Sequence, residues 1–238
     1  MKKNINKKTK IFCDTADFNI IKKMGRNNLV NGFTTNPTLM KFSGAKNYEK
    51  YAKKLLKASN KKPISFEVFS DNHNEMEKQA YKINSWGSNI YVKIPVTNSR
   101  GKFSGNLIRK LSNKKIKLNI TAVYTVKQVR DIFKCLNKNS YAFISIFCGR
   151  MADVGKDPLP IVKRSISITK KNKKVKILWA STREIYNFTQ AKECGCHIIT
   201  MPPKIIEKIS KFGKTFETLT LETVKTFYKD AVAAKFRI

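Results

Sequence analysis

Short apolar segments with the length of β-strands recur along the chain at intervals of roughly 27 residues, close to the ~30 residues of a βα unit. Each is bounded by polar or turn-forming residues, which is typical of strands buried on both faces. We expect eight strands, over Lys10–Asp14, Gly32–Thr35, Pro63–Phe69, Asn89–Ile94, Lys117–Thr121, Tyr141–Phe147, Val175–Ala180 and Cys196–Thr200.

Amphipathic segments, with apolar residues at three- and four-residue spacing, lie between these strands and predict helices. They include Asn47–Ala58, Asn74–Trp86, Thr125–Leu136, Leu159–Lys170 and Thr182–Glu193, and a last helix over Glu217–Lys235. The apolar face of that last helix comprises Leu219, Leu221, Val224, Phe227, Tyr228 and Val232. Repeated βα units of this length form either a doubly wound sheet or a closed (β/α)8 barrel.

Polar residues at or near the carboxyl ends of the strands favour the barrel. They are Asp14, Asn36, Glu67, Lys93, Asn119, Thr121, Ser145 and Ser181. A closed barrel brings these ends to one mouth, whereas an open sheet spreads them along an edge. No GxGxxG motif follows a strand, so a dinucleotide-binding fold is not supported. We therefore expect an α/β protein with one (β/α)8 TIM barrel and an extra C-terminal helix, in a single domain over residues 1–238.

Composition supports a folded chain with an unusual charge. The 238 residues are 41% hydrophobic and include 15 Phe, enough to form a sizeable core. Lys and Arg number 49 against 16 Asp and Glu, a formal charge of +33. The basic residues are spread along the chain, which favours non-specific attraction to polyanions over specific nucleic-acid binding. No apolar run approaches the roughly 18 residues of a membrane span, so we expect a cytoplasmic protein without a membrane partner.

Cysteine and histidine usage narrows the chemistry. The five cysteines are odd in number and form no CxxC pair, which argues against a disulfide framework and fits a reducing compartment. The only histidines, His73 and His197, are too few for a three-histidine zinc site. Zinc-dependent chemistry is therefore disfavoured, and we expect no metal.

Lys93 is a candidate nucleophile because it lies in an otherwise uncharged apolar strand, Ile90-Tyr91-Val92-Lys93-Ile94-Pro95-Val96. Burial disfavours the charged form of the amine, and a neutral amine can attack a carbonyl to form the Schiff base of a class I aldolase. The alternative is that Lys93 extends from the strand end into solvent. The strand pattern by itself does not decide between these two interpretations.

Neighbouring strand ends offer groups that suit this chemistry. Asp14 and Glu67 would be costly to bury without partners, and two acids beside a lysine can perform acid–base steps on an iminium ion. Asn119 and Thr121 are two positions apart on one strand, so they share a face and can hold a substrate hydroxyl and a water. For each residue alone, an ordinary strand-end hydrogen bond is an equal alternative.

Two segments resemble specific motifs of the transaldolase family. Asn31-Gly32-Phe33-Thr34-Thr35-Asn36-Pro37-Thr38 is similar to the G-[VF]-T-[TS]-N-P-[ST] signature, and Tyr91-Val92-Lys93-Ile94-Pro95-Val96-Thr97 looks like the Schiff-base strand. The resemblance continues in register from Asp14 to about Thr200 through Asp14-Thr15-Ala16, Ile64-Ser65-Phe66-Glu67-Val68, Asn119-Ile120-Thr121, Ser145-Ile146-Phe147-Cys148-Gly149-Arg150 and Ala180-Ser181-Thr182-Arg183.

This resemblance implies a role for each matching residue. Lys93 would form the Schiff base, Asp14 would take the proton of the C4 hydroxyl, and Glu67 with Thr121 would hold a proton-shuttling water. Substrate contacts would come from Asn36, Asn119 and Ser145 to the dihydroxyacetone unit, from Phe147 as an apolar wall, and from Arg150, Ser181 and Arg183 to the sugar phosphate. Two guanidinium groups near a hydroxyl also suit a phosphate on charge and geometry.

Three functions are compared. The first is a transaldolase, a transferase expected to need no cofactor, which passes a dihydroxyacetone unit from a ketose phosphate to an aldose phosphate. The second is a fructose-6-phosphate aldolase-like enzyme that releases dihydroxyacetone, or a relative specialised for an unusual sugar. The resemblance associates Glu67 and Phe147 with transfer. The chain length, however, is that of the short, aldolase-type branch. Ile146 and Cys148 also differ from the Pro and Val that are commoner beside Phe147 in the family. The third, a non-enzymatic polyanion-binding barrel, does not require the acid–lysine set. Sugar phosphates are the expected partners, and the sequence leaves a homo-oligomer open.

Overall fold

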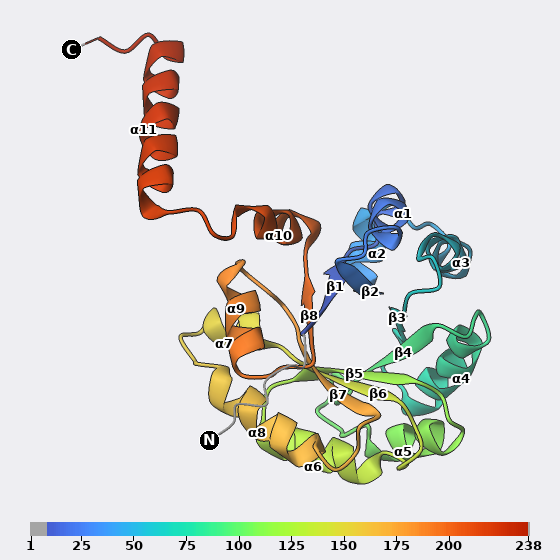
Figure 1. Cartoon of the computed structure of the whole chain (residues 1–238). Coiled ribbons are helices and arrows are strands. Elements are labelled where there is room, and N and C mark those ends of the chain that lie inside the picture. Colours follow the sequence, from blue (N-terminus) through green and yellow to red (C-terminus); the bar gives the residue numbers. More distant parts are fainter. Residues whose placement is uncertain (1–8, 238) are drawn as a thin grey trace. The chain divides into compact units, whose positions relative to one another are not determined.

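A closed barrel of parallel strands forms the centre of the protein (Figure 1). The structure is a computed structural model that describes residues 9–237. Within them, each strand pairs with the next and β8 closes on β1. The strands are β1 Lys10–Asp14, β2 Val30–Thr34, β3 Ile64–Glu67, β4 Ile90–Pro95, β5 Leu118–Val123, β6 Ala142–Ile146, β7 Val175–Trp179 and β8 Ile198–Met201.

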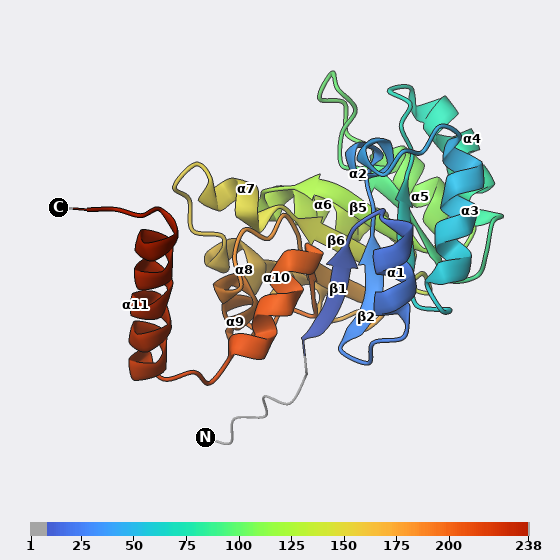
Figure 2. The same ribbon diagram turned by 90° about the horizontal axis from the view of Figure 1, so that it is seen from above.

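Helices connect successive strands on the outside of the barrel, as the two views show (Figures 1 and 2). They are α1 Phe18–Gly25, α2 Pro37–Phe42, α3 Tyr48–Ala58, α4 His73–Asn84, α5 Gly105–Asn113, α6 Val126–Cys135, α7 Cys148–Ala152, α8 Leu159–Thr169 and α9 Tyr186–Glu193. After β8 come α10 Pro203–Glu207, the 3-10 helix η1 Lys208–Lys211 and α11 Phe216–Ala233.

The prediction of a (β/α)8 barrel with a C-terminal helix is confirmed, with shifts at the element boundaries. The largest concerns α9, which begins at Tyr186 and not at Thr182, because residues 182–183 are irregular and the Asn187 side-chain oxygen accepts from the Arg183 and Glu184 N–H groups. Helices α1, α2, α5, α7 and α10 were not singled out from the pattern. Each has nine residues or fewer, too short for an apolar period to stand out.

The strand ends carry local signals that place the site. Asn36 lies two residues after β2 and caps α2, with its side-chain oxygen accepting from the Leu39 N–H at 2.8 Å. Pro37 follows at the first helical position, where its missing N–H costs nothing. The Thr34-Thr35-Asn36-Pro37 motif therefore turns the chain sharply from the barrel mouth into a helix.

Strand register aligns the central site residues. Glu67 of β3 pairs with Lys93 of β4, and Lys93 pairs with Asn119 of β5. Paired residues on neighbouring strands point to the same face of a sheet. The barrel therefore brings an acid, an amine and an amide side by side inside its carboxyl-terminal end.

The C-terminal segment forms a compact unit of its own. The barrel unit ends at Ile206, and the second unit begins at Glu207 and contains α11. Thr215 caps α11, in which no residue is buried. Its predicted apolar face is exposed, with Phe227 at 68% and Tyr228 at 70% of full accessibility. The expectation of one domain over residues 1–238 stays a prediction. No helix within residues 9–237 is both long and apolar enough to cross a bilayer.

Candidate active site

A cavity of about 220 Å³ opens at the carboxyl ends of the barrel strands. Ten of the eleven site residues expected from the sequence line it: Asp14, Asn36, Lys93, Asn119, Thr121, Ser145, Phe147, Arg150, Ser181 and Arg183. The eleventh, Glu67, contacts Lys93 directly. Residues separated by most of the chain are thus gathered at one mouth, the place where (β/α)8 barrels carry their chemistry.

Lys93 lies inside the barrel and is held at two points. The residue is 7% exposed, and its Nζ lies 3.1 Å from Glu67 Oε2 and 3.0 Å from the carbonyl oxygen of Thr35, to which it donates. The alternative in which Lys93 extends into solvent is therefore wrong. A buried amine facing a cavity, with a carboxylate at hydrogen-bonding distance, can exchange protons with that carboxylate and attack a carbonyl.

Asp14, the last residue of β1, lines the same cavity as Lys93 and is also held by hydrogen bonds. It accepts a hydrogen bond of 2.6 Å from the Thr34 hydroxyl, and Thr34 Oγ1 is 2.6 Å from Thr200 Oγ1. Burial raises the pKa of Asp14 above its ordinary value, while the charge of Lys93 and the Thr34 hydrogen bond partly oppose that rise. A carboxylate with a raised pKa takes up and returns a proton more readily near neutral pH.

A hydrogen-bonded row of side chains crosses the barrel between β3 and β6. Ser145 donates to Asn119 Oδ1 at 2.6 Å, and Asn119 Nδ2 donates to Ser65 Oγ at 3.0 Å. All three are buried, so the Asn119 amide is fixed in one orientation. The buried Thr121 hydroxyl has no hydrogen-bond partner within residues 9–237, and it can bond a substrate or a water.

Cationic side chains form the rim. The Arg150 guanidinium lies 5.8 Å from the centre of the Phe147 ring, and Arg183 forms a bidentate ion pair with Asp153. That pair lowers the pKa of Asp153. The Asp153 carboxylate therefore offsets part of the attraction of Arg183 for an anionic ligand, whereas Arg150 is an exposed cation at the mouth.

Close backbone packing joins the two rim loops. A Cβ added at Gly149 would lie 1.5 Å from the carbonyl oxygen of Ser181, a distance that no side chain tolerates. Ser181 has a left-handed φ of 63°, a strained conformation for a residue with a side chain. The Gly149 contact and this conformation together set the position of the Ser181 hydroxyl.

Three residues at the site were missed by reasoning from the sequence: Thr34, Ser65 and Thr200. Each is a buried hydroxyl on a barrel strand. Thr34 and Ser65 lie two residues before the predicted site residues Asn36 and Glu67, so strand alternation could have placed each on the same face as its neighbour. Nothing in the sequence pairs Thr200 with Thr34, 166 positions away.

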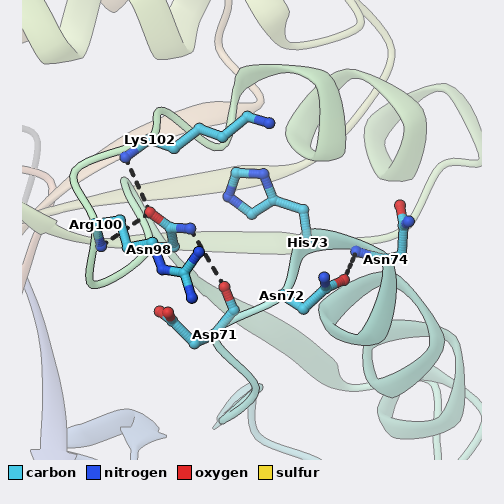
Figure 3. A pocket seen from close by; sticks show the side chains of 7 residues that line it. All are labelled: Asp71, Asn72, His73, Asn74, Asn98, Arg100 and Lys102. Carbon is cyan, nitrogen blue, oxygen red and sulfur yellow. Dashed lines mark hydrogen bonds between the residues drawn. The ribbon is translucent and has the colours of Figure 1, made fainter.

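A larger polar pocket, of about 410 Å³, lies between the loops after β3 and β4 (Figure 3). Its residues are Asp71, Asn72, His73, Asn74, Asn98, Arg100 and Lys102. Most of the drawn hydrogen bonds hold the loops themselves: the Asn98 side chain accepts from the Arg100 and Lys102 N–H groups and donates to the Asp71 carbonyl. Because none of these seven described residues contributes a buried amine or carboxyl group, we assign the chemistry to the smaller cavity.

The fold and the cavity define a (β/α)8-barrel enzyme built around a buried lysine. A family model described as Transaldolase/Fructose-6-phosphate aldolase matches residues 11–238. A Thermoplasma volcanium protein named "Probable transaldolase" is 36% identical over 89% of this chain and 92% of its own length. A Dehalococcoides mccartyi protein of the same name is 33% identical over 87% and 92%. The chain belongs to the transaldolase/fructose-6-phosphate aldolase family, and the expected resemblance and enzyme class are confirmed.

Solved structures show the same fold at low identity. One described as native KDPGal covers 98% of this chain and all of its own, with a TM-score of 0.53 at 10% identity. Another, described as KGPDC from Streptococcus mutans, has a TM-score of 0.55 at 8% identity and covers 82% of this chain and 88% of its own. At these identities the likeness concerns the barrel alone.

Proposed function

We propose that the protein is a transaldolase that transfers a dihydroxyacetone unit from a ketose phosphate to an aldose phosphate through a Schiff base on Lys93. The observation that carries the proposal is the buried Lys93 amine, held by Glu67 and Thr35 inside a cavity that Asp14 also lines. The family match and the relatives named "Probable transaldolase" support it.

The first steps build the imine. The Lys93 amine attacks the ketose C2 carbonyl, and the resulting carbinolamine loses water to form an iminium ion. Glu67 lies 3.1 Å from the amine and is the group placed to move protons during this step. The Thr121 hydroxyl has no hydrogen-bond partner among the described residues. We assign to it the binding of a water that passes protons to and from Glu67.

Carbon–carbon cleavage follows. Asp14 takes the proton of the C4 hydroxyl, the C3–C4 bond breaks, and its electron pair flows into the iminium to leave an enamine on Lys93. The aldose phosphate departs, and the enamine carbon attacks the aldehyde of the acceptor. Asp14 returns the proton to the new hydroxyl, and water releases the product ketose from Lys93.

Binding roles follow from the positions around the cavity. Asn119 and Ser145 are fixed by their mutual hydrogen bond and can orient the hydroxyls of the dihydroxyacetone unit. The Asn36 side-chain oxygen caps α2, so its amide N–H₂ is the part free to donate to substrate. We assign phosphate binding to Arg150 and Ser181. Arg183 adds a second cation, whose attraction for the phosphate is reduced by its ion pair with Asp153.

Phe147 bears on whether the unit is transferred or released. Its ring lines the cavity and supplies no proton donor, so enamine protonation by water is expected to be slow and the enamine awaits an aldehyde. The fructose-6-phosphate aldolase-like reaction, or a reaction on an unusual sugar, is the second candidate, and the description of the matching family model, which includes fructose-6-phosphate aldolase, supports it.

Acceptor dependence distinguishes these candidates. Fructose 6-phosphate alone should yield glyceraldehyde 3-phosphate in an amount near one per active site, and erythrose 4-phosphate should restore steady turnover. Phe147→Tyr should raise release of dihydroxyacetone, because a phenol donor then faces the enamine. Sustained release by the unmodified protein without an acceptor would reverse the assignment in favour of the aldolase.

We propose that this reaction is part of carbohydrate metabolism in the cytoplasm. Its substrates would be sugar phosphates of the pentose phosphate pathway, and it would need no cofactor. We also propose a homo-oligomer, because the apolar face of α11 is not buried within its own unit and burial of such a face stabilises association. Phe227 and Tyr228 are its largest exposed side chains. Light scattering of the wild type and of Phe227→Glu would measure this association.

A further inference from the structure

A cavity of about 420 Å³, here called the second cavity of the barrel, lies at the amino-terminal end of the strands, opposite the catalytic mouth. Its lining comes from the starts of the strands and the loops before them: Lys10, Phe12, Asn31, Pro63, Tyr91, Tyr141, Phe143, Lys173, Lys174, Lys176, His197 and Ile198. The proposed transaldolase reaction uses none of these residues. The volume is within the range of small-molecule sites.

Aromatic rings form the floor and one wall of this cavity. Tyr91 stacks on Phe143, with ring centres 3.9 Å apart and planes 11° from parallel, and Phe143 meets Phe12 edge-on at 5.6 Å. Phe12 and Phe143 are buried, so this cluster is rigid. Tyr141 stands beside it, half exposed, and offers a flat apolar surface to a ring-shaped ligand.

Cations surround these rings. Lys174 Nζ lies 5.6 Å from the centre of the Tyr141 ring, and Lys117 Nζ lies 5.9 Å from that of Tyr91. Lys10 and Lys173 are exposed at the rim. Among the described residues that line the cavity there are four lysines and no carboxylate, so the local field favours an anion.

We propose that this cavity binds a nucleoside polyphosphate, with the base against Tyr141 and Tyr91 and the phosphates on the lysines. Aromatic stacking accepts any flat base, and ammonium groups hold phosphates as point charges. The Asn31 side-chain oxygen accepts from the Ile11 N–H at 3.1 Å, which leaves its amide N–H₂ to donate to a base or ribose oxygen. A sugar phosphate would contact the lysines and leave the aromatic surface uncovered. A nucleotide would contact both, with its base on the aromatic rings and its phosphates at the lysines.

The test compares three probes on the full-length protein by titration calorimetry: ATP, adenosine and inorganic tripolyphosphate. ATP should bind with one site per chain, about tenfold or more tighter than tripolyphosphate, because stacking of the base adds to the charge attraction. Borohydride trapping at Lys93 should be unchanged by saturating ATP, because the two cavities are at opposite ends of the barrel. This readout separates failure of the nucleotide site from failure of the transaldolase assignment.

Matched variants locate the site. Tyr141→Ser should weaken ATP about tenfold and leave tripolyphosphate unchanged, whereas Lys174→Gln should weaken both. The controls are Tyr81→Ser, which removes another exposed tyrosine, and Lys229→Gln, which removes the same charge on α11. Equal affinities for ATP and tripolyphosphate, or equal losses in Lys174→Gln and Lys229→Gln, would overturn the proposal in favour of general charge attraction. Tighter binding of a single-stranded oligonucleotide than of ATP would overturn it in favour of RNA.

Discussion

Replacement of Thr34 by Val tests how the barrel prepares Asp14 for acid–base work. Valine keeps the shape of the buried side chain and removes the hydroxyl that donates to Asp14 at 2.6 Å. A hydroxyl has one proton, so Thr34 donates to Asp14 and Thr200 must donate to Thr34. The substitution therefore removes a charge-assisted hydrogen bond from the carboxylate.

The expected size follows from that bond. Hydrogen bonds to charged groups contribute about 1.5–3 kcal/mol, so loss of this bond destabilises the carboxylate and should raise the pKa of Asp14 further. Asp14 acts as a carboxylate when it takes the C4 proton, and activity is lost as the pH falls through its pKa. A higher pKa therefore moves the acid limb of the kcat/KM profile to higher pH.

The assay is the pH dependence of acceptor-dependent transfer. Thr169→Val is the matched control, because it removes a buried threonine hydroxyl that bonds only helix carbonyls of α8. Its acid limb should coincide with that of the wild type. If Thr34→Val lowers the rate at every pH without moving the acid limb, Thr34 does not tune Asp14 and the assigned role of Asp14 is wrong.

Three further substitutions test other parts of the site. Lys93→Met should abolish the borohydride-trappable adduct and turnover while the circular dichroism spectrum is retained; an adduct on another lysine would contradict the assignment. Gly149→Ala should cost at least the roughly 1–3 kcal/mol of overpacking, because its Cβ meets the Ser181 carbonyl, and lower Tm by about 2–4 °C per kcal/mol. Arg150→Ala should weaken phosphorylated substrates by about 1.5–3 kcal/mol more than dihydroxyacetone, as measured by KM; equal losses would count against it.

Much of the fold and of the candidate site could be predicted from the sequence. Eight apolar segments at βα spacing predict a parallel sheet covered by helices, because each strand is buried on both faces. The polar residues near the strand ends then favour a closed barrel over an open sheet. A charged residue in such a strand, as at Lys93, is unusual enough to mark the site. Glu67, Lys93, Asn119 and Ser145 follow one another at equal intervals of 26 residues, close to the length of one βα unit, so the spacing places one of them on each of four successive strands.

Only the tertiary structure decided which groups touch. The bonds from Thr34 to Asp14 and from Asn119 to Ser65 join different strands, and the aromatic floor of the second cavity joins residues of β1, β4 and β6. Such contacts depend on strand register, and a slip of one residue turns every side chain to the other face. A strand boundary inferred from an apolar pattern is uncertain by a residue or more, about 3.3 Å of rise, whereas a hydrogen bond tolerates a few tenths of an ångström. The sequence therefore predicts which residues form the site, whereas closure of the barrel decides which of them form hydrogen bonds with one another.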